Sequence, residues 1–438
     1  MERQAAALAA VLALAGAAPA RSQQPPAPTA QELAAFVDAE LADLVAFYRE
    51  LHQHPELSFH ERDTAARLAA QLEAAGCQVT RGVGGTGVVA LLQNGDGRVG
   101  MLRTDLDALP IAEATGLPFA STVRAPAAGG GEIGVMHACG HDLHMTNLVG
   151  TARWFARHRD RWHGTLLLVG QPAEERAGGA KAMLAAGLFE RFPKPAFALA
   201  LHCEPLLPAG TVGLRAGATW AAVDSVDVTL FGKGGHGAAP HRAIDPIVLA
   251  AQYVLALQTI VSRETDPVDS AVITVGSIHA GSKHNIIPDR CDLQLSVRSY
   301  DERVRAHLRD AIVQKAKGLA LAAGAPEPQV VFSEPTGPVV NDATITATAT
   351  AAMRAVLGDG NVVDVRPHMI AEDFGEYGAA GVPICMFRLG TTAPERLQRL
   401  AQGGGPPALH TDGFYPDVEP ALHAGIPAMV AALGALLR

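Results

Sequence analysis

The stretch TLLLVGQPAEE, residues 165–175, joins an apolar run to a proline and two adjacent glutamates. A short apolar run without polar alternation is typical of a strand that is buried on both faces of an α/β sheet. The run AFALALHC, residues 196–203, has the same character, and a helical pattern lies between the two. Ligands of open α/β sheets bind at the carboxyl ends of the strands. The two runs therefore predict an α/β fold with functional residues around Glu174, Glu175 and His202.

Similar patterns occur on both sides of these strands. An amphipathic pattern over residues 31–75 predicts two helices, interrupted where Pro55 ends the first. GVVALL (87–92) and VGMLRTD (99–105), separated by the turn QNGDGR, predict two neighbouring strands. Near the C-terminus, the apolar run CMFRLG and a helical segment from Pro420 return to the α/β pattern.

The middle of the chain has a different order of elements. From residue 219 the patterns predict strand, helix, two strands, helix and strand, which is the split βαβ order of a ferredoxin-like module. A chain of 438 residues is also more consistent with two domains than with one core. We therefore expect residues 219–335 to form an inserted α+β domain between the two parts of the α/β domain, residues 31–218 and 336–438.

Charge and composition limit the class of ligand. The formal net charge is −9, whereas nucleic acids and anionic membranes select clustered Lys and Arg. We therefore expect a small-molecule ligand, with no nucleic acid and no membrane as partner. The five cysteines are odd in number, far apart and without a C-x-x-C pair, so a disulfide framework is not expected.

The stretch MHACGHDLHM, residues 136–145, concentrates histidine, cysteine and aspartate in front of a helical segment. Together with residues at the predicted strand ends and in ALHTDGF, it supplies thiolate, imidazole and carboxylate donors. The candidate ligands are Cys139, His141, Glu175, His202 and His410. This mixture suits Zn, Mn, Co or Ni better than Mg or Ca. Five protein ligands exceed what one tetrahedral zinc takes, so we expect two divalent ions per chain.

Acidic pairs at the strand ends offer further chemistry. Because adjacent side chains diverge, one member of the pair Glu174 and Glu175 can ligate a metal while the other moves a proton, and adjacency alone leaves the order open. Asp107 is a candidate catalytic-site residue that either orients a ligand histidine or caps the turn at DALP. A cysteine hydrolase with Cys139 as nucleophile is the rival hypothesis, but it leaves the other candidate ligands without a role.

Two residues of the expected inserted domain have open roles. GKGGHG, residues 232–237, formally fits a dinucleotide-binding motif, but no acidic residue follows a second strand at the required spacing. His236 is then an exposed imidazole on a permissive loop. Arg298 lies on the polar face of the predicted strand CDLQLSVRS, where it either covers the sheet or binds a carboxylate.

A set of motifs from about Leu33 to the C-terminus resembles one known family. The motifs are LHQHPELSFHE, RTDLDALPI, MHACGHDLHM, QPAEERAGGAKAML, GKGGHGAAPH, HNIIPD, AEDFGEYG and LHTDGF. In this order they resemble the amidohydrolase branch of the aminoacylase and carboxypeptidase-like metallopeptidases, which includes hippurate hydrolases and plant auxin-conjugate hydrolases. The resemblance implies a two-metal, aminopeptidase-like catalytic domain with an inserted ferredoxin-like lid and dimerisation domain, and hence a homodimer.

The resemblance also implies roles for single residues. The five candidate ligands match the metal ligands of the family, and Glu174 matches its general base. His236 matches a residue that helps to hold the substrate, often from the other subunit, and Asn285 and Arg298 match residues near the substrate carboxylate. The loop at Arg176-Ala177 and the position of Ile370 depart from the family, where glycine is more common, and we expect both departures to alter the substrate pocket.

The expected activity is therefore metal-dependent hydrolysis of the amide bond of an N-acyl amino acid, which releases a carboxylate and a free amino acid. One alternative is a dipeptidase or aminopeptidase on the same scaffold, and a comparison of hippurate with Gly-Gly as substrates separates the two. Another alternative is an exported binding protein without catalysis, against which the intact Glu174 argues.

The N-terminus has the features of a signal peptide. Residues 5–18 are apolar, which is short of the roughly 20 residues that span a bilayer, and Ala18-Pro19-Ala20 fits the small-x-small pattern that signal peptidase cleaves. We expect residues 1–20 to be removed and the protein to be periplasmic or secreted. N-terminal sequencing of the mature protein should begin near Arg21, and an intact Met1 on a cytosolic protein would contradict export.

Overall fold

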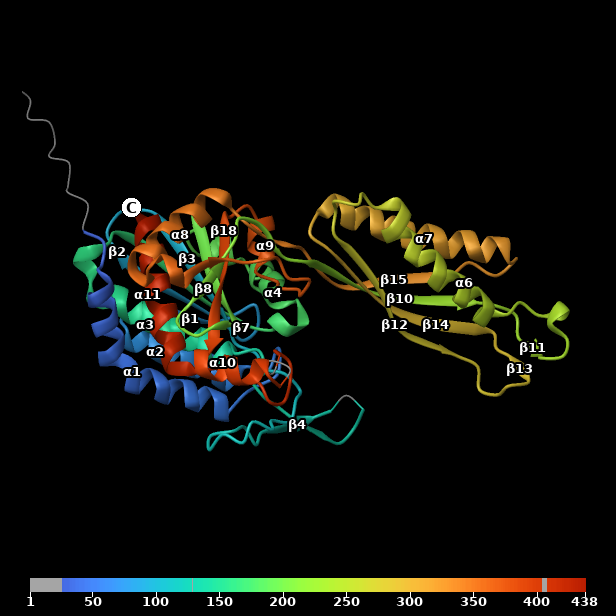
Figure 1. Cartoon of the computed structure of the whole chain (residues 1–438), viewed down its shortest axis with the longest axis horizontal. Helices are drawn as coiled ribbons and strands as arrows, with labels where there is room; N and C mark the ends of the chain where they lie inside the picture. The colour runs from blue at the N-terminus through green and yellow to red at the C-terminus, as the bar shows by residue number, and fades with distance from the viewer. Residues whose placement is uncertain (1–25, 128, 404–407) are drawn as a thin grey trace, which may run out of the picture.

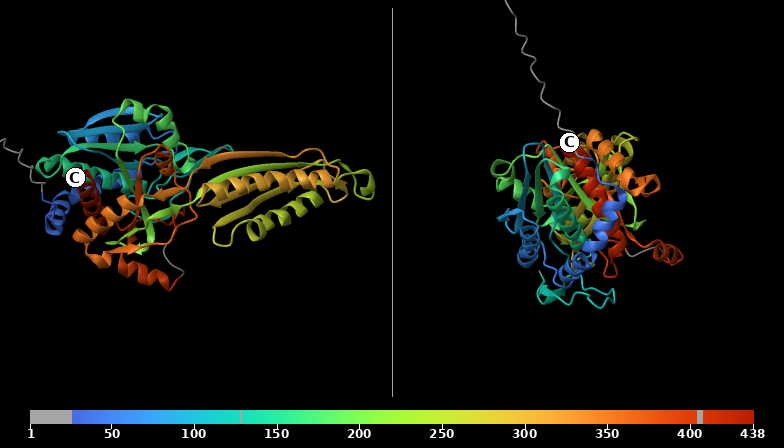
Figure 2. Two further views of the ribbon diagram at one scale, coloured as in Figure 1. Left: turned by 90° about the horizontal axis from the view of Figure 1, so that it is seen from above. Right: turned by 90° about the vertical axis from the view of Figure 1, so that its left-hand side faces the viewer.

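The computed structural model describes residues 26–127, 129–403 and 408–438. The chain forms two lobes that lie side by side (Figure 1). Seen from above, the second lobe extends away from the first and makes the molecule long and narrow (Figure 2). The expected signal peptide, residues 1–20, lies outside the described residues.

The first lobe is built on an eight-stranded mixed sheet. In sheet order its strands are β1 (Gln78–Val83), β2 (Gly87–Asn94), β6 (Gly164–Gln171), β3 (Val99–Asp105), β7 (Phe197–Pro208), β18 (Ile384–Thr392), β8 (Val212–Leu214) and β17 (Val362–Asp364). The four central strands β6, β3, β7 and β18 run parallel to one another and are buried along most of their length. Their carboxyl ends therefore meet at one edge, as the apolar runs predict.

The prediction that residues 87–92 and 99–105 form neighbouring strands is wrong, because β6 lies between β2 and β3. β6 pairs antiparallel with β2 and parallel with β3. The four residues 95–98 connect β2 to β3. Crossing one intervening strand needs about 10 Å, which four extended residues can reach. Both faces and both edges of the apolar β6 are thereby removed from water.

Helices cover both faces of this sheet (Figures 1 and 2). One face packs against α1 (Ala30–Gln53), α2 (Arg62–Ala74), α3 (His141–Arg157), α8 (Ala343–Leu357) and α11 (Val418–Leu437). The other face packs against α4 (Gly179–Ala185), α5 (Leu188–Arg191) and α9 (Gly375–Ala379). α10 (Pro394–Ala401) follows β18. By length and composition α11 could cross a membrane, but most of its residues are buried in this core.

The second lobe has a four-stranded antiparallel sheet. In sheet order the strands are β12 (Ala271–Ala280), β14 (Arg290–Ser299), β10 (Ala222–Phe231) and β15 (Gln329–Thr336). Helices α6 (Pro246–Thr259) and α7 (Glu302–Ala322) lie on one face of this sheet (Figure 1). Apolar side chains between the helices and the sheet form a core of their own. The order of elements is the ferredoxin-like order that the sequence predicts.

The described residues also form three small sheets of two strands each. β9 (Gly217–Trp220) and β16 (Val339–Asn341) pair close to the points where the chain enters and leaves the second lobe. β4 (Arg124–Pro126) and β5 (Glu132–Gly134) form a hairpin that projects from the first lobe. β11 (Gly235–His236) and β13 (Ile286–Ile287) lie at the end of the second lobe that is farthest from the first (Figure 1).

Candidate metal centre and active site

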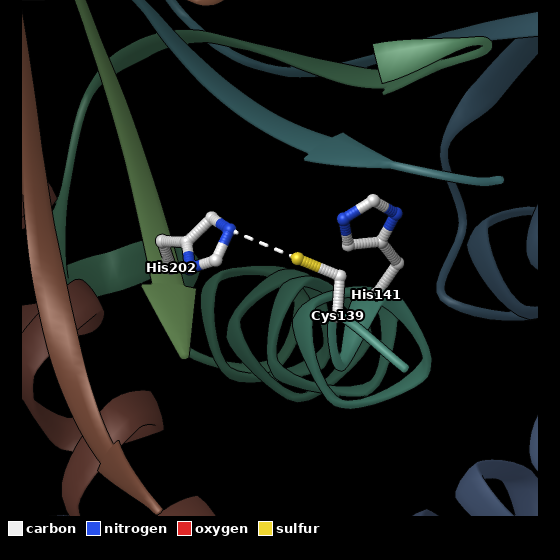
Figure 3. Close-up of side chains that lie close together, drawn as sticks. All are labelled: Cys139, His141 and His202. Carbon is white, nitrogen blue, oxygen red and sulfur yellow. Dashed lines mark hydrogen bonds between the residues drawn. The ribbon is translucent and has the colours of Figure 1, made fainter. Parts of the chain in front are cut away.

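The turn before α3 brings three candidate ligands together. Figure 3 shows Cys139 and His141 at the start of α3, beside His202 on β7. The Sγ atom of Cys139 lies 3.4 Å from Nε2 of His202, and one donor atom of each residue lies within 4.8 Å of the other two. Gly140 between them has φ 78°, and a Cβ there would lie 2.6 Å from Sγ of Cys203. Only glycine therefore fits this turn.

The turn after β6 carries the two glutamates. Ala173 and Ala177, which flank it, both have left-handed backbone angles, with φ near 48°. Oε1 of Glu175 lies 3.3 Å from Nε2 of His410 and 3.8 Å from Nε2 of His141. Glu174 lies beside the same imidazole, 3.9 Å away. All five candidate ligands and Glu174 therefore meet at the carboxyl ends of β6 and β7.

The donor set fits a divalent metal. Nε2 of His141 and Oε1 of Glu175 are buried, and neither has a hydrogen-bond partner within the described chain. The donors also fall into overlapping groups, which are Cys139–His141–His202, Cys139–Glu175–His410 and His141–Glu174–Glu175. Overlapping groups of mixed thiolate, imidazole and carboxylate donors are suited to two neighbouring ions of the Zn, Mn, Co or Ni type.

Asp107 holds both ligand-bearing turns in place. Its Oδ1 accepts a hydrogen bond from the backbone N–H of Glu174 (3.1 Å), and its Oδ2 accepts one from that of Glu175 (3.0 Å). Its backbone oxygen lies 2.8 Å from Nδ1 of His141, which turns Nε2 toward the glutamates. Glu61 also holds the start of the turn that carries the two glutamates, because its Oε1 accepts from the N–H of Ala173 (2.8 Å). Of the two roles left open by the sequence, the geometry favours orientation of ligands.

A buried arginine that sequence analysis missed balances the acids of this region. Arg103 lies on β3 and has no exposed side-chain surface. It donates to Asp105 (2.7 Å), Glu372 (2.9 Å), Asp373 (3.0 Å) and Gln171 (3.0 Å). The available signal was an arginine inside the apolar strand GMLRTD, since a buried cation needs acidic partners.

Charge and burial also shape the reactivity of the site. Burial, together with Glu372 and Glu175, raises the pKa of Glu174 well above its ordinary value, which suits a group that takes up and releases a proton. Burial, together with Glu175 and Glu174, raises the pKa of the Cys139 thiol. A cysteine nucleophile must be a thiolate without a bound metal, and the burial and carboxylates around Cys139 disfavour that form, so they argue against a cysteine hydrolase.

The other histidines near the site support the structure around it. Nδ1 of His144 lies 2.7 Å from Asp105, and its Nε2 accepts from the N–H of Cys203. His52 is buried between Asp142 (2.7 Å) and Glu113 (3.1 Å). His137 is buried as well, and neither of its ring nitrogens has a hydrogen-bond partner in the described chain.

A cavity of about 440 Å³ opens onto Glu174 and onto the candidate ligands Cys139, Glu175, His202 and His410. The second lobe contributes Arg298 to its wall, whereas His236 and Asn285 are not among the lining residues. His236 belongs to β11 and Asn285 directly precedes β13, at the far end of the second lobe (Figure 1). A single chain therefore brings together the candidate ligands, Glu174, Asp107 and Arg298, but not His236 and Asn285.

Comparison with known proteins identifies the class. The model of peptidase family M20/M25/M40 matches residues 101–400, and the chain belongs to this family. The chain is 38% identical to an N-acetyl-L-cysteine deacetylase of Bacillus subtilis, over 76% of this chain and 77% of the relative. It is 39% identical to a hippurate hydrolase of Campylobacter jejuni, over 74% of this chain and 82% of the relative.

A solved structure agrees with these matches. The YXEP protein of Bacillus subtilis, described as a dinuclear metal-binding peptidase of the M20 family, superposes with a TM-score of 0.75. It is 30% identical, and the match covers 91% of this chain and 99% of that one. The predicted fold class and the prediction of a metal-dependent amidohydrolase are confirmed.

The Asp107 contacts predict the effect of its removal. Asp107→Ala should lower metal affinity by about 10–100-fold and reduce activity, because the backbone of Glu174 and Glu175 loses its acceptor. Asp107→Asn should behave similarly, since both carboxylate oxygens accept N–H groups and an amide supplies only one acceptor. Metal titration of the purified variants measures the effect.

Ser58→Ala is the matched control. It removes only the hydrogen bond from Ser58 Oγ to Asp107 Oδ2 (2.7 Å) and leaves both backbone contacts in place. Its metal affinity should stay close to that of the wild type. Unchanged metal affinity in both Asp107 variants would contradict the orienting role.

Proposed function

We propose that this protein hydrolyses the amide bond of N-acyl amino acids with two divalent metal ions held by the candidate ligands. The proposed ligands are Cys139, His141, Glu175, His202 and His410. The observation that carries the proposal is that their donor atoms form overlapping groups beside Glu174, and that all of them except His141 line one cavity. The relatives named as a deacetylase of N-acetylcysteine and a hippurate hydrolase support this substrate class.

The residues of the chain divide the chemical work. Divalent ions supply Lewis acidity in hydrolases of this kind. Glu174 lies buried at the cavity wall, where its carboxylate takes the proton of the attacking water and passes it to the leaving amine. Asp107 holds the backbone of Glu174 and Glu175, so that both carboxylates face the proposed metal site. Arg298 lines the cavity, and in this proposal its guanidinium binds the substrate's α-carboxylate bidentately.

Acylated substrates fit the cavity better than dipeptides with a free amine. A free ammonium group needs an acidic partner, but two of the acids that line the cavity beside the metal donors are already engaged. Asp373 accepts from Arg103, Gln171 and the N–H of Ala180, and Glu372 accepts from Arg103. An aminopeptidase or dipeptidase remains the alternative, and faster hydrolysis of Gly-Gly than of hippurate would favour it.

The division of labour between the two glutamates can be tested by exchange of each. Glu174→Gln should keep the metals and nearly the same KM while kcat falls by about 10²–10⁴-fold, because the proton carrier is lost. Glu175→Ala should lower metal affinity, and added metal should restore part of its activity. Kinetics at increasing metal concentration measure both effects. If metal rescues the Glu174 variant and not the Glu175 variant, the two roles are reversed.

We also propose a homodimer formed through the second lobe. Ile247, Val248 and Leu255 on the outer face of α6 are 44%, 55% and 71% exposed, which gives an apolar surface that the rest of the described chain does not cover. A second copy would cover it and would bring His236 and Asn285, which are remote from their own cavity, toward the cavity of the partner.

Sedimentation velocity tests the dimer. The wild type should sediment as a dimer, and Leu255→Asp should shift it toward the monomer, because a charge in an apolar interface is costly to bury. Leu321→Asp is a control on α7, since Leu321 is also apolar and 82% exposed. A wild type that is monomeric at all concentrations would contradict the proposal.

A further inference from the structure

Arg388 occupies an unusual place in the wall of the cavity. It lies on β18 and pairs in parallel register with His202 on β7, so that the two side chains share one face of the sheet. Its guanidinium carbon lies 5.2 Å from the centre of the Trp220 ring, which is itself 6.2 Å from the His202 ring. Arg388, Trp220 and His202 all line the cavity. Arg388 is therefore separated from a candidate metal ligand by one aromatic ring.

The guanidinium of Arg388 is buried but poorly satisfied. Arg388 is 4% exposed, and a guanidinium carries five N–H donors. One donor reaches the backbone oxygen of Thr219 at 3.4 Å, Nη1 lies 3.7 Å from Glu204, and Nε has no partner within the described chain. Arg103, by contrast, has four acceptors at 2.7–3.0 Å. Leaving buried charged donors unpaired is costly, so a group that enters the cavity and accepts from Arg388 is favoured.

The charges around Arg388 leave room for an anion. Glu204 is the one carboxylate within 4 Å in the described chain, and it also accepts from the N–H of Leu206 (3.1 Å) and lies 3.3 Å from His368. Arg215, nearby on the same lobe, adds further positive charge. From the opposite lobe Arg298 lines the same cavity and donates to the backbone oxygen of Met369. The guanidinium groups of Arg388 and Arg298 therefore line the same cavity, one from each lobe.

We propose that this cavity selects N-acyl amino acids that carry a second carboxylate, and that Arg388 binds this second group. The inference rests on the proposed function, in which Arg298 binds the α-carboxylate. A carboxylate matches the planar guanidinium, with two parallel hydrogen bonds. A cavity of about 440 Å³ is large enough for a small diacid. The second carboxylate belongs either to an acidic amino-acid side chain or to the distal end of a dicarboxylic acyl group.

Two pairs of substrates test the proposal and distinguish these sources. N-acetylglutamate is compared with N-acetylglutamine, and N-succinylalanine with N-succinamoylalanine, so that each pair differs only by a carboxylate and a carboxamide. In at least one pair the wild type should prefer the acid by about 10-fold or more in kcat/KM, as expected for a charged hydrogen-bonded pair. Arg388→Gln should remove this preference by slowing hydrolysis of the acid while hydrolysis of the amide changes little.

Arg215→Gln is the matched control, because it removes a nearby positive charge but no guanidinium that lines the cavity, so the preference should be kept with at most a small decrease. Glu204→Gln removes the competing carboxylate and should increase the preference, so it tests the proposal even if Arg388→Gln does not fold. Equal rates on acid and amide in both pairs would overturn the proposal, as would a preference that survives in Arg388→Gln. If Arg388→Gln lowers kcat/KM equally for the acid and the amide of each pair, Arg388 acts on the α-carboxylate that all four substrates share, and the proposal would also be overturned.

Binding separates this proposal from the proposed function. If the metal-loaded wild type hydrolyses no N-acyl amino acid, the proposed function fails. Calorimetry with glutarate and its monoamide then still tests Arg388. Tighter binding of glutarate by the wild type, lost in Arg388→Gln, supports the second-carboxylate site, and equal binding of the two compounds overturns it.

Discussion

The carboxylate of Asp107 is the constraint on which the site depends. One oxygen accepts from the N–H of Glu174 and the other from that of Glu175, while the backbone oxygen of the same residue orients His141. Because Asp107 holds both glutamates through their backbone N–H groups, their side-chain carboxylates remain available to bind metal or to transfer a proton. A single residue at the carboxyl end of β3 thereby fixes the turn after β6 and the helix start of α3 relative to each other.

Burial of so much negative charge requires compensation elsewhere. Arg103 supplies it beneath the site through hydrogen bonds to Asp105, Glu372 and Asp373. These contacts also tie β3 to the segment before α9, which is distant in sequence. Arg388 is the opposite case, a buried guanidinium whose partners lie at 3.4 Å and beyond. The donors of Arg103 are satisfied within the chain, whereas the proposed second carboxylate of the substrate would supply acceptors to Arg388.

Much of the fold follows from local patterns in the sequence. Apolar runs identified β6 and β7, and the polar residues at their ends located the site, because parallel strands place their carboxyl ends together. The prediction that β2 and β3 are neighbours was wrong, because a short connection is compatible both with a hairpin and with a crossing over one strand. Sheet order depends on pairing between distant segments, which local patterns do not contain.

The candidate site divides in the same way. Donor type and position were enough to select Cys139, His202, His141, His410 and one of the two adjacent glutamates, since thiolate, imidazole and carboxylate at strand ends are rare by chance. The choice of Glu175 over Glu174 as the ligand came from the family resemblance. The partners of Arg103 and the unsatisfied donors of Arg388 could not be found, because they depend on which side chains meet across the sheet. His236 and Asn285 were selected by family resemblance, and their distance from the cavity follows from the extended second lobe.

The number and position of bound metal ions test the two-metal site. Crystals of the protein grown with Zn or Mn should show about two anomalous peaks per chain, one near Cys139 and His202 and the other near Glu175 and His410. A single ion per chain, or peaks remote from these residues, would contradict the two-metal site on which the proposed hydrolysis rests.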